Sequence, residues 1–412
     1  MQRAAKKSFM DVQSRPPSNP SRSADPGPAS TPPLATTSSG YSLEVVTTED
    51  GLSNLREDWN LLSDAAAFPN VFMSFDWFRV WNRCFALQAR CGRRHPQVLV
   101  LKRGGRVGGI APFIHRTASR FGVAVRKVEF LESESSYNDC VWGNDPAGQT
   151  AALWDFLAQT EDQWDLVDLR SVRETGNVLP HLKISLAHTK LIYRFLPENP
   201  CHYLALDAPW PEMLSRRSRS TRHTFQTQER RLEEMRAEGL RIRIIEDPQN
   251  EPRLLEKLIA LEGQKEIDGK CVDPWMARYP EVFQSLFSAL GPRGWISVAL
   301  MELGDLPVAC VWAFRCGKKL WCYNRAFNPA YSRLSPGTML DTALIDYGFA
   351  HGYEEYDFLY GREPYKMKWS TGSHERFRLV IWSRRWISRA RAYVYLDLKE
   401  AVYRRWGKKA DP

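Results

Sequence analysis

The chain has 412 residues, of which 43% are hydrophobic and 25% are charged. This length is sufficient for two or three domains with substantial cores, and the composition is typical of a globular protein. The formal net charge of +9 favours anionic partners, whether a phosphorylated cofactor, a membrane surface or nucleic acid.

Eight cysteines form no Cys-x-x-Cys pair and no cysteine–histidine cluster. We therefore expect no disulfide framework and no metal site, and a reducing cytoplasm fits this cysteine usage. No apolar run approaches the roughly 18 residues of a membrane span. The first residues, MQRAAKKSFMDVQ, lack the apolar segment of a secretory signal, so the sequence predicts a cytoplasmic protein.

Residues 1–40 are rich in proline, serine, threonine and alanine. They contain too few large apolar residues to offset the entropy lost on ordering, so we predict a disordered tail. A first α/β unit follows. It comprises strands at 41–46, 127–131, 139–142 and 164–169, helices at 52–63 and 147–159, an aromatic segment at 72–85 and a hairpin at 97–114.

A basic segment at 214–236 predicts a helix whose first turns are almost wholly positive. Its later turns mix charges of both signs, as a solvated helical face does. No acidic residue lies nearby in the sequence to offset the first turns, which favours an anionic ligand there. These residues are Arg216, Arg217, Arg219, Arg222 and His223, of which Arg219 and Arg222 are the candidate substrate-binding residues. Nucleic acid is a weaker fit, because no aromatic interleaving accompanies the charge.

An amphipathic helix is predicted at 254–267 and another at 280–290. Glu262 and Glu266 are spaced to lie on one face of the first helix. In a cleft the two acids would supply a general base, whereas on an isolated surface helix they would have no such role.

The second α/β unit has a hairpin at 295–315, a strand at 320–324, a helix at 335–351 and a strand at 353–359. Ser335 suits the N-cap of that helix and Pro336 its first position. Free N–H groups at Gly337 and Thr338, with the helix dipole and nearby Arg333, predict a phosphate site.

The two units follow the same order, which indicates an internal duplication. Gly148 precedes Asp168 by the spacing at which Gly337 precedes Asp357, so the two aspartates are expected at equivalent strand positions. The first unit shows no basic residue beside its helix start. We therefore assign cofactor binding to the second unit.

The segment 384–409 is strongly basic and contains interspersed aromatic and aliphatic residues. It is either an interfacial helix on anionic lipid, and thus a peripheral membrane or synthase contact, or a helix that packs its apolar face on the domain.

Three runs resemble the C-terminal half of the CelD-like acyltransferases of the GNAT superfamily, which are associated with cellulose or exopolysaccharide synthesis. They are Pro329 to Thr338, Tyr356-Asp-Phe358 and Pro364-Tyr-Lys-Met-Lys-Trp369. The similarity extends to 71–81, 108–113 and 215–231, and covers about residues 42–380. The duplication also resembles the tandem arrangement of the FemAB-type transferases.

The resemblance implies an α/β fold of two tandem GNAT-like domains, with mixed sheets flanked by helices. The expected ranges are 1–40 for the tail, 41–205 and 206–383 for the domains, and 384–412 for the basic helix. The implied function is acyl-CoA-dependent transfer, most simply of acetyl, to an amine or hydroxyl of a saccharide-related acceptor.

The resemblance also implies roles for particular residues. The acyl-CoA pyrophosphate would lie at Ser335, Gly337 and Thr338 with Arg333, although the usual GNAT loop, Arg/Gln-x-x-Gly-x-Gly/Ala, is replaced by Arg333-Leu-Ser-Pro-Gly-Thr338. The pantetheine would follow Tyr323 and Asn324. The remaining candidates are Tyr360 and Tyr365 as proton donors, Asp357 and Glu363 as proton relays, and Lys366 as a partner of phosphate or acidic acceptor.

Two alternatives remain open from the sequence. One is a FemAB-type transferase that uses aminoacyl-tRNA, although no long heptad-bearing insertion is found. The other is a non-catalytic module that binds an anionic polymer or a synthase.

Overall fold

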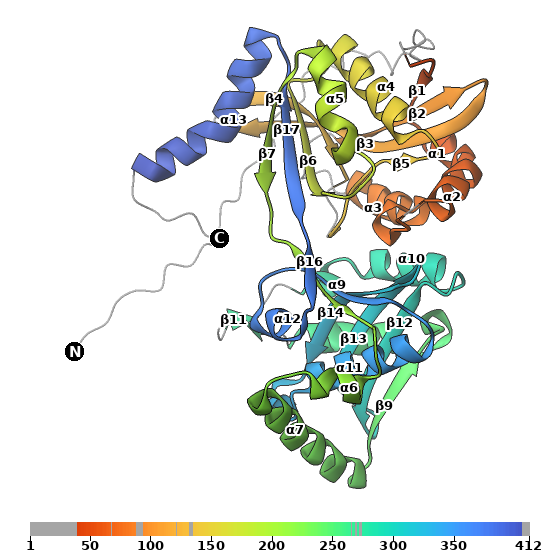
Figure 1. Ribbon diagram of the computed structural model, residues 1–412, viewed down its shortest axis with the longest axis vertical. Coiled ribbons are helices and arrows are strands. Elements are labelled where there is room, and N and C mark those ends of the chain that lie inside the picture. The colour runs from red at the N-terminus through yellow and green to blue at the C-terminus, as the bar shows by residue number, and fades with distance from the viewer. Residues whose placement is uncertain are drawn as a thin grey trace, which may run out of the picture. The chain divides into compact units, whose positions relative to one another are not determined.

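The protein is described by a computed structural model. It describes residues 39–66, 68–87, 94–120, 122–131, 135–264, 266–267, 270–271 and 274–405. The predicted tail at 1–40 therefore lies almost wholly outside the described residues, as does the end of the basic segment. Two main sheets organise the described part of the chain, and their elements are labelled in Figure 1.

The first sheet has the strand order β1-β2-β3-β4-β6-β17-β7, with β5 paired to β3. Its strands are β1 (Ser42–Val46), β2 (Arg94–Arg103), β3 (Arg106–Arg120), β4 (Val123–Phe130), β5 (Val141–Trp142), β6 (Leu166–Arg173), β7 (Ile192–Pro197) and β17 (Arg376–Trp382). Helices α4 (Pro146–Gln159) and α5 (Leu179–Thr189) bury apolar side chains against one face. The other face packs against α1 (Glu49–Asn54), α2 (Arg56–Asp64), the short turn η1 (Val71–Met73) and α3 (Phe75–Leu87).

The second sheet has the order β16-β8-β15-β14-β13-β12-β9. Its strands are β8 (Cys201–Ala205), β9 (Leu240–Ile245), β12 (Ile296–Leu303), β13 (Leu306–Cys316), β14 (Lys319–Phe327), β15 (Glu355–Tyr360) and β16 (Gly372–His374). Helices α6 (Trp210–Ser215), α7 (Arg219–Ala237) and α11 (Pro336–Ala350) contribute to the core on one face. Helices α8 (Leu254–Glu262), α9 (Trp275–Arg278) and α10 (Pro280–Leu290) contribute to the core on the other.

Both sheets repeat one topology. In each sheet, a run of antiparallel strands leads to one parallel pair, and a crossover helix connects the two strands of that pair. Helix α4 connects β4 to β6 in the first sheet, and α11 connects β14 to β15 in the second. Each parallel pair is hydrogen-bonded over three residue pairs, and the last of these is Glu129 with Asp168 in one sheet and Trp321 with Asp357 in the other. This register confirms the predicted equivalence of Asp168 and Asp357, and the fold is two GNAT-like α/β units in tandem.

Sheet membership differs from the sequence-based ranges at two places. Residues 201–205, inside the range expected for the first domain, form β8, which pairs with β15 and β16 of the second sheet. Residues 376–382, inside the range expected for the second domain, form β17, which lies between β6 and β7 of the first sheet. The strand patterns are local, whereas the partner of an edge strand is set by long-range packing, so this exchange is not visible in a pass along the chain.

The last described helix is α13 (Trp386–Arg405). Ala392 is buried against the first sheet and Leu396 packs beside it, so one face of the helix contacts the domain. Trp386 and Tyr393 remain 77% and 55% exposed. Of the helices in the described part of the chain, none has the length and apolar character needed to cross a bilayer.

Candidate active site

A cavity of about 450 Å³ opens where β14 and β15 separate. The two strands pair in parallel only from Lys319 with Glu355 to Trp321 with Asp357, and the ends beyond these residues are not paired with each other. The lining residues come from β14, β15, α8, α9, the helix α12 (Pro364–Trp369) and a loop of the first unit. They are Ser136, Glu262, Trp275, Cys322, Tyr323, Asn324, Arg325, Phe358, Leu359, Tyr360, Glu363, Tyr365 and Lys366.

Arg325 in the cavity wall is fixed by a buried network. Its guanidinium donates to the Asp341 carboxylate at 2.9 Å and lies 3.9 Å from the centre of the Tyr365 ring. Asp341 also accepts a hydrogen bond from the Tyr356 hydroxyl at 2.9 Å. Burial raises the pKa of Asp341, against the lowering effect of Arg325. The network fixes the orientation of Arg325 and Tyr365 toward the cavity.

The start of α11 has no side-chain cap. Ser335, at the N-cap, has a left-handed backbone conformation with φ of 49°, and its side chain makes no capping hydrogen bond. Its hydroxyl instead accepts a hydrogen bond from Gln228 of α7 at 2.5 Å. The Thr338 N–H, which was predicted to be free, donates to the Ser335 carbonyl at 2.9 Å. The positive end of the helix dipole still suits an anion.

The equivalent helix α4 is capped by an acid. Asp145 accepts a hydrogen bond from the Gly148 N–H at 3.0 Å and from Arg103 at 3.0 Å. The prediction that no basic residue lies beside this helix start was wrong, because Arg103 reaches it from the β2–β3 hairpin. The site is nevertheless filled, since the Asp145 carboxylate occupies the position of an anionic ligand.

The predicted cofactor residues divide into two groups. Tyr323 and Asn324 line the cavity, whereas Arg333, Ser335, Gly337 and Thr338 lie at the start of α11 and are not among its lining residues. Gly337 links the groups: a Cβ there would lie 2.1 Å from Nη2 of Arg325. The glycine is therefore needed for the guanidinium to lie against the helix start.

Glu262 is the last residue of α8 and is 6% exposed. Its Oε2 accepts the Met276 N–H at 2.6 Å, and its Oε1 accepts Nδ2 of Asn324 at 3.0 Å. The predicted helix at 254–267 was too long, because Gly263 forms the C-cap. Glu266 lies instead on β10 (Glu266–Ile267), which pairs with β11 (Lys270–Cys271), and its side chain lies outside the described part of the structure. The two acids do not share a helical face.

The predicted loop after β15 contains the short helix α12. Tyr365 is half-buried in the cavity wall, and burial raises the pKa of its hydroxyl well above the ordinary value. Tyr360 is 43% exposed. Lys366 is 5% exposed and donates to the Tyr360 carbonyl at 2.5 Å, and its Nζ lies 3.2 Å from Glu363. Three of the four predicted catalytic residues, Tyr360, Glu363 and Tyr365, thus line the cavity.

Asp357, the fourth, is 0% exposed and does not line the cavity. Its carboxylate accepts a hydrogen bond from the Tyr137 hydroxyl at 2.6 Å and from the Leu359 N–H at 2.7 Å. Leu359 has a positive φ of 59°, which costs roughly 1 kcal/mol for a residue with a side chain. Burial raises the pKa of Asp357. Asp357 therefore lies behind the cavity wall, where its carboxylate contacts Tyr137 and Leu359, and it does not reach the cavity itself.

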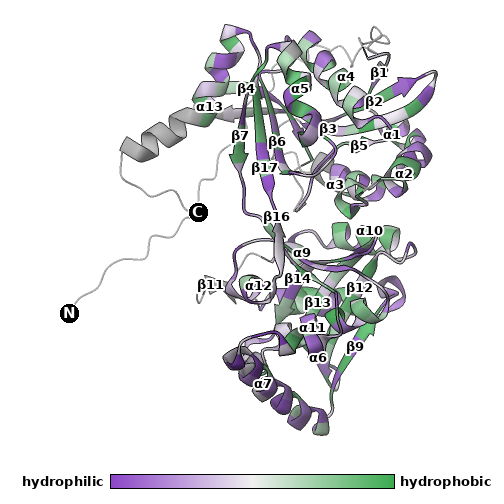
Figure 2. Cartoon of the chain, in the orientation of Figure 1, coloured by the Kyte–Doolittle hydropathy of each residue, from purple (hydrophilic) through white to green (hydrophobic). Residues whose placement is uncertain are grey.

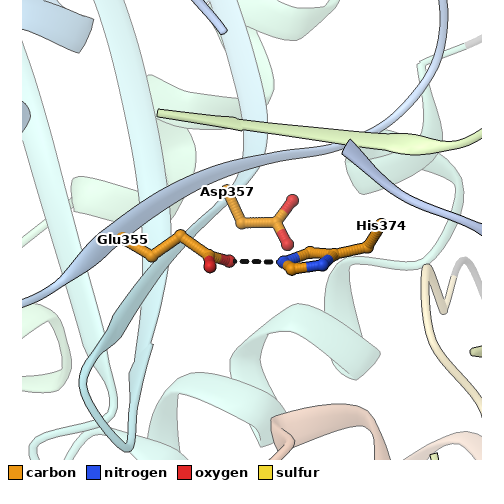
Figure 3. A group of neighbouring side chains, drawn as sticks. All are labelled: Glu355, Asp357 and His374. Carbon is orange, nitrogen blue, oxygen red and sulfur yellow. Dashed lines mark hydrogen bonds and ion pairs between the residues drawn. The ribbon is translucent and has the colours of Figure 1, made fainter. Parts of the chain in front are cut away.

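Asp357 also belongs to a cluster with Glu355 and His374 (Figure 3). Nε2 of His374 lies 2.9 Å from Oε1 of Glu355, and Nδ1 of His374 lies 3.1 Å from Nη2 of Arg173. Lys319 lies 2.6 Å from Glu355. Burial would raise the pKa of Glu355, but the bonds from His374 and Lys319 outweigh it and lower the pKa. Two cations already contact the atoms that would bind a metal, so the cluster is better described as a hydrogen-bond network.

The basic helix α7 is hydrophilic along most of its length (Figure 2). The predicted helix at 214–236 is divided, because α6 ends at Ser215 and α7 begins at Arg219. The prediction that no acid offsets the first arginines was wrong for Arg216, whereas Arg217 and Arg222 have neutral carbonyl partners. Arg216 pairs with Asp207 and Glu212, Arg217 donates to the Trp369 carbonyl, and Arg222 donates to the Ser215 and Arg217 carbonyls. Arg219 is exposed. Further along, Arg231 donates to the Arg333 carbonyl at 3.1 Å, so α7 lies beside the start of α11.

Sequence reasoning missed several residues of the site. Arg325 continues the predicted strand at 320–324 by one position, and a longer strand pattern would have included it. Trp275 and Ser136 lie in parts of the sequence without a periodic hydrophobic pattern, so no strand or helix was predicted that would place them at the site. Tyr137 comes from the first unit, and no local signal places it against Asp357.

The comparisons with known proteins agree with this description. Residues 219–367, from the start of α7 into α12, match the acetyltransferase (GNAT) domain family. The site just described therefore lies mainly within the segment that matches this family. No curated protein matches the sequence.

Solved structures share the fold at low sequence identity. The crystal structure of FemX is 11% identical with a TM-score of 0.52, covering 78% of this chain and 95% of that one. The C-terminal domain of a putative lysylphosphatidylglycerol synthetase from Agrobacterium fabrum is 13% identical with a TM-score of 0.50, covering 85% and 97%. A conserved protein of unknown function from Bacteroides thetaiotaomicron is 9% identical with a TM-score of 0.50, covering 82% and 99%. At these identities the likeness concerns the fold alone.

Proposed function

We propose that the protein is an acyl-CoA-dependent acyltransferase that acylates an amine or hydroxyl of a saccharide-related acceptor. The observation that supports this most is the separation of β14 and β15 within the GNAT-matching segment, which leaves a polar cavity beside an uncapped helix start. The acceptor class and the acetyl group rest on the CelD-like resemblance of the same segment.

In this proposal the donor extends from the start of α11 to the cavity. The Gly337 N–H, the positive end of the α11 dipole and the Arg333 side chain would hold the pyrophosphate, and Arg325, which is paired with Asp341, lies against Gly337 beside them. Backbone groups of Tyr323 and Asn324, where β14 is free of β15, would hold the pantetheine. The acyl-CoA supplies the activated thioester.

The transfer forms a bond from the acceptor nitrogen or oxygen to the acyl carbon and breaks the bond from that carbon to sulfur. Glu363, in the cavity wall, would accept the proton that the acceptor loses. Tyr365 would donate a hydrogen bond to the departing thiolate. Its raised pKa keeps the hydroxyl protonated at neutral pH, which suits a hydrogen-bond donor better than a source of a free proton.

Hydrogen exchange with and without acetyl-CoA tests this assignment. We expect protection of the start of α11 and of the free end of β14, and none at the start of α4, because Asp145 already fills that position. Protection confined to residues 140–160 would reverse the assignment. No protection by acetyl-CoA would count against the proposed function.

An alternative donor is aminoacyl-tRNA, as in a FemAB-type transferase. The fold shared with FemX and with the lysylphosphatidylglycerol synthetase domain favours it. Binding of tRNA whose log affinity falls steeply with log salt, about −0.7 per single-strand phosphate contacted, with no acetyl-CoA binding, would support this alternative. A module with neither activity would bind neither donor.

We place the protein in the cytoplasm on the cysteine usage of its sequence. The exposed Trp386 and Tyr393 of α13 support a peripheral contact with anionic lipid through 384–409. Flotation with anionic and neutral vesicles measures this contact, and equal recovery with both would argue against it.

A further inference from the structure

Some charged side chains of the cavity wall have a partner of opposite charge, and one has only neutral partners. Arg325 is paired with Asp341 at 2.9 Å, and Lys366 with Glu363 at 3.2 Å. Each of these cations therefore has its own acid. Glu262 is the remaining charged residue among those described as lining the cavity.

Glu262 accepts hydrogen bonds from two neutral donors. The Met276 peptide N–H reaches one oxygen at 2.6 Å and the Asn324 amide reaches the other at 3.0 Å. A carboxylate that accepts at both oxygens has the pattern of the ionised form, since a protonated carboxyl would have to donate from one of them. Within the described part of the chain, no lysine, arginine or histidine forms an ion pair with it.

A buried carboxylate without a cation is costly, because hydrogen bonds from neutral groups replace only part of its hydration. Glu262 is only 6% exposed, and the exposed part faces a cavity. The same wall contains the rings of Trp275, Tyr323 and Tyr360, whose faces attract cations. An acid and several aromatic rings around a cavity form a suitable environment for an organic cation.

We infer that Glu262 is the counter-ion for a protonated amine of the substrate. The inference rests on the proposed function in that it narrows the acceptor to an amine-bearing molecule. A metal ion fits less well, because Asn324 presents its N–H group to Glu262, and one carboxylate cannot complete a coordination shell. Asn324 and Met276 fix the carboxylate in place, so its orientation does not depend on the ligand.

Matched pairs of amine and neutral compound test the inference on the whole protein. The probes are glucosamine with N-acetylglucosamine, and benzylamine with benzyl alcohol, each measured by the shift in thermal unfolding. We expect a larger shift from the amine of each pair, because only it carries the positive charge. Equal shifts within both pairs, including no shift from any probe, would overturn the inference.

Two variants locate the effect. Glu262→Gln removes the charge and should weaken amine binding by about tenfold or more, the range for a hydrogen bond to a charged group. Glu256→Gln is the control: it removes a charge from the same helix, but this side chain is 70% exposed and pairs with Arg253. Retained preference for the amines in Glu262→Gln would overturn the inference. If Glu262→Gln does not fold, the comparison of probes on the unaltered protein still decides it.

Acetyl-CoA binding is measured on the same proteins, so the two proposals can fail separately. A preference for amines without acetyl-CoA binding would refute the proposed function and leave the cation site. Acetyl-CoA binding without a preference for amines would refute the cation site and leave the proposed function.

Discussion

Tyr137→Phe tests the side-chain hydrogen bond that joins Tyr137 of the first unit to Asp357 behind the cavity. The substitution removes a single oxygen, which lies 2.6 Å from the Asp357 carboxylate. Tyr137 is 1% exposed and Asp357 is 0% exposed, so water does not replace the lost donor without rearrangement. The ring itself keeps its edge contact with Trp321, 5.2 Å between centroids.

The expected loss follows from the burial of both partners. A hydrogen bond to a charged acceptor contributes about 1.5 to 3 kcal/mol, and one to a neutral acceptor about 1 kcal/mol. We therefore expect Tyr137→Phe to lower the free energy of unfolding by about 2 kcal/mol when Asp357 is ionised. Because Asp357 also holds the Leu359 N–H, we expect a lower kcat as well.

The loss depends on pH with a definite sign. Burial raises the pKa of Asp357 in the folded protein, while the Tyr137 hydrogen bond lowers it. A raised folded pKa means that stability falls as pH rises from the unfolded to the folded value of that pKa. Without the hydroxyl the folded pKa is higher still, so the decline continues to higher pH. The difference between the variant and the unaltered protein should therefore grow as pH rises through the range above the ordinary carboxyl pKa.

Urea unfolding across that pH range measures the difference. Tyr347→Phe is the control, because its hydroxyl donates at 2.8 Å to the Glu246 carboxylate, whose side chain is 49% exposed. The hydroxyl also accepts from Arg315 at 2.9 Å, but Arg315 keeps its own ion pair with Glu246 in the variant. Its loss should be below about 1 kcal/mol. Equal losses in the two variants, or a loss in Tyr137→Phe that does not change with pH, would refute the argument from burial.

Two further predictions concern the cavity wall and the adjoining start of α11. Tyr365→Phe should lower kcat and leave the affinity for acyl-CoA nearly unchanged, because the hydroxyl is proposed to act on the departing thiolate. If kcat is unchanged in both Tyr365→Phe and Tyr360→Phe, neither tyrosine takes part in the chemistry. Gly337→Ala should cost about 3 kcal/mol of stability, since its Cβ would displace Arg325 from buried Asp341. Gly263→Ala, whose Cβ would meet nothing nearer than 3.5 Å, should be within about 0.5 kcal/mol of the parent, and a similar cost in both variants would contradict this account.

The duplicated topology was predictable because it rests on local signals. Hairpins, crossover helices and their N-terminal prolines follow from patterns of a few residues, and Asp168 and Asp357 follow from equal spacing. The start of α11 at Ser335 was likewise anticipated, but Ser335 was expected to cap the helix, and its side chain makes no capping hydrogen bond. These features need no knowledge of which strands become neighbours.

The lining of the cavity was less predictable because it depends on long-range contacts. Glu262 was selected for a helical pairing with Glu266 that the Gly263 cap prevents, yet it lines the cavity because Asn324 and Met276 hold it there. The arginines before and at the start of α7 were selected for lacking acids in the sequence. Arg216 nevertheless pairs with Glu212, four residues earlier, a partner that the sequence does contain. The carbonyl of Trp369 is brought to Arg217 by the fold, and a count of nearby charges does not detect such a partner.

The two units differ most at the places where a ligand would bind. In the first, Asp145 fills the helix start, and Asp168 is paired with Lys127 at 2.8 Å and with Arg378 of β17 at 2.6 Å. Burial would raise the pKa of Asp168, but these partners lower it. In the second, the equivalent Asp357 has a tyrosine partner and a raised pKa, the helix start lacks a cap, and the strands beside it enclose a cavity. Strand β17 thus supplies Arg378, which pairs with Asp168 in the first unit. In the second unit, the helix start without a side-chain cap and the cavity beside β14 and β15 are the positions where we propose that a ligand binds.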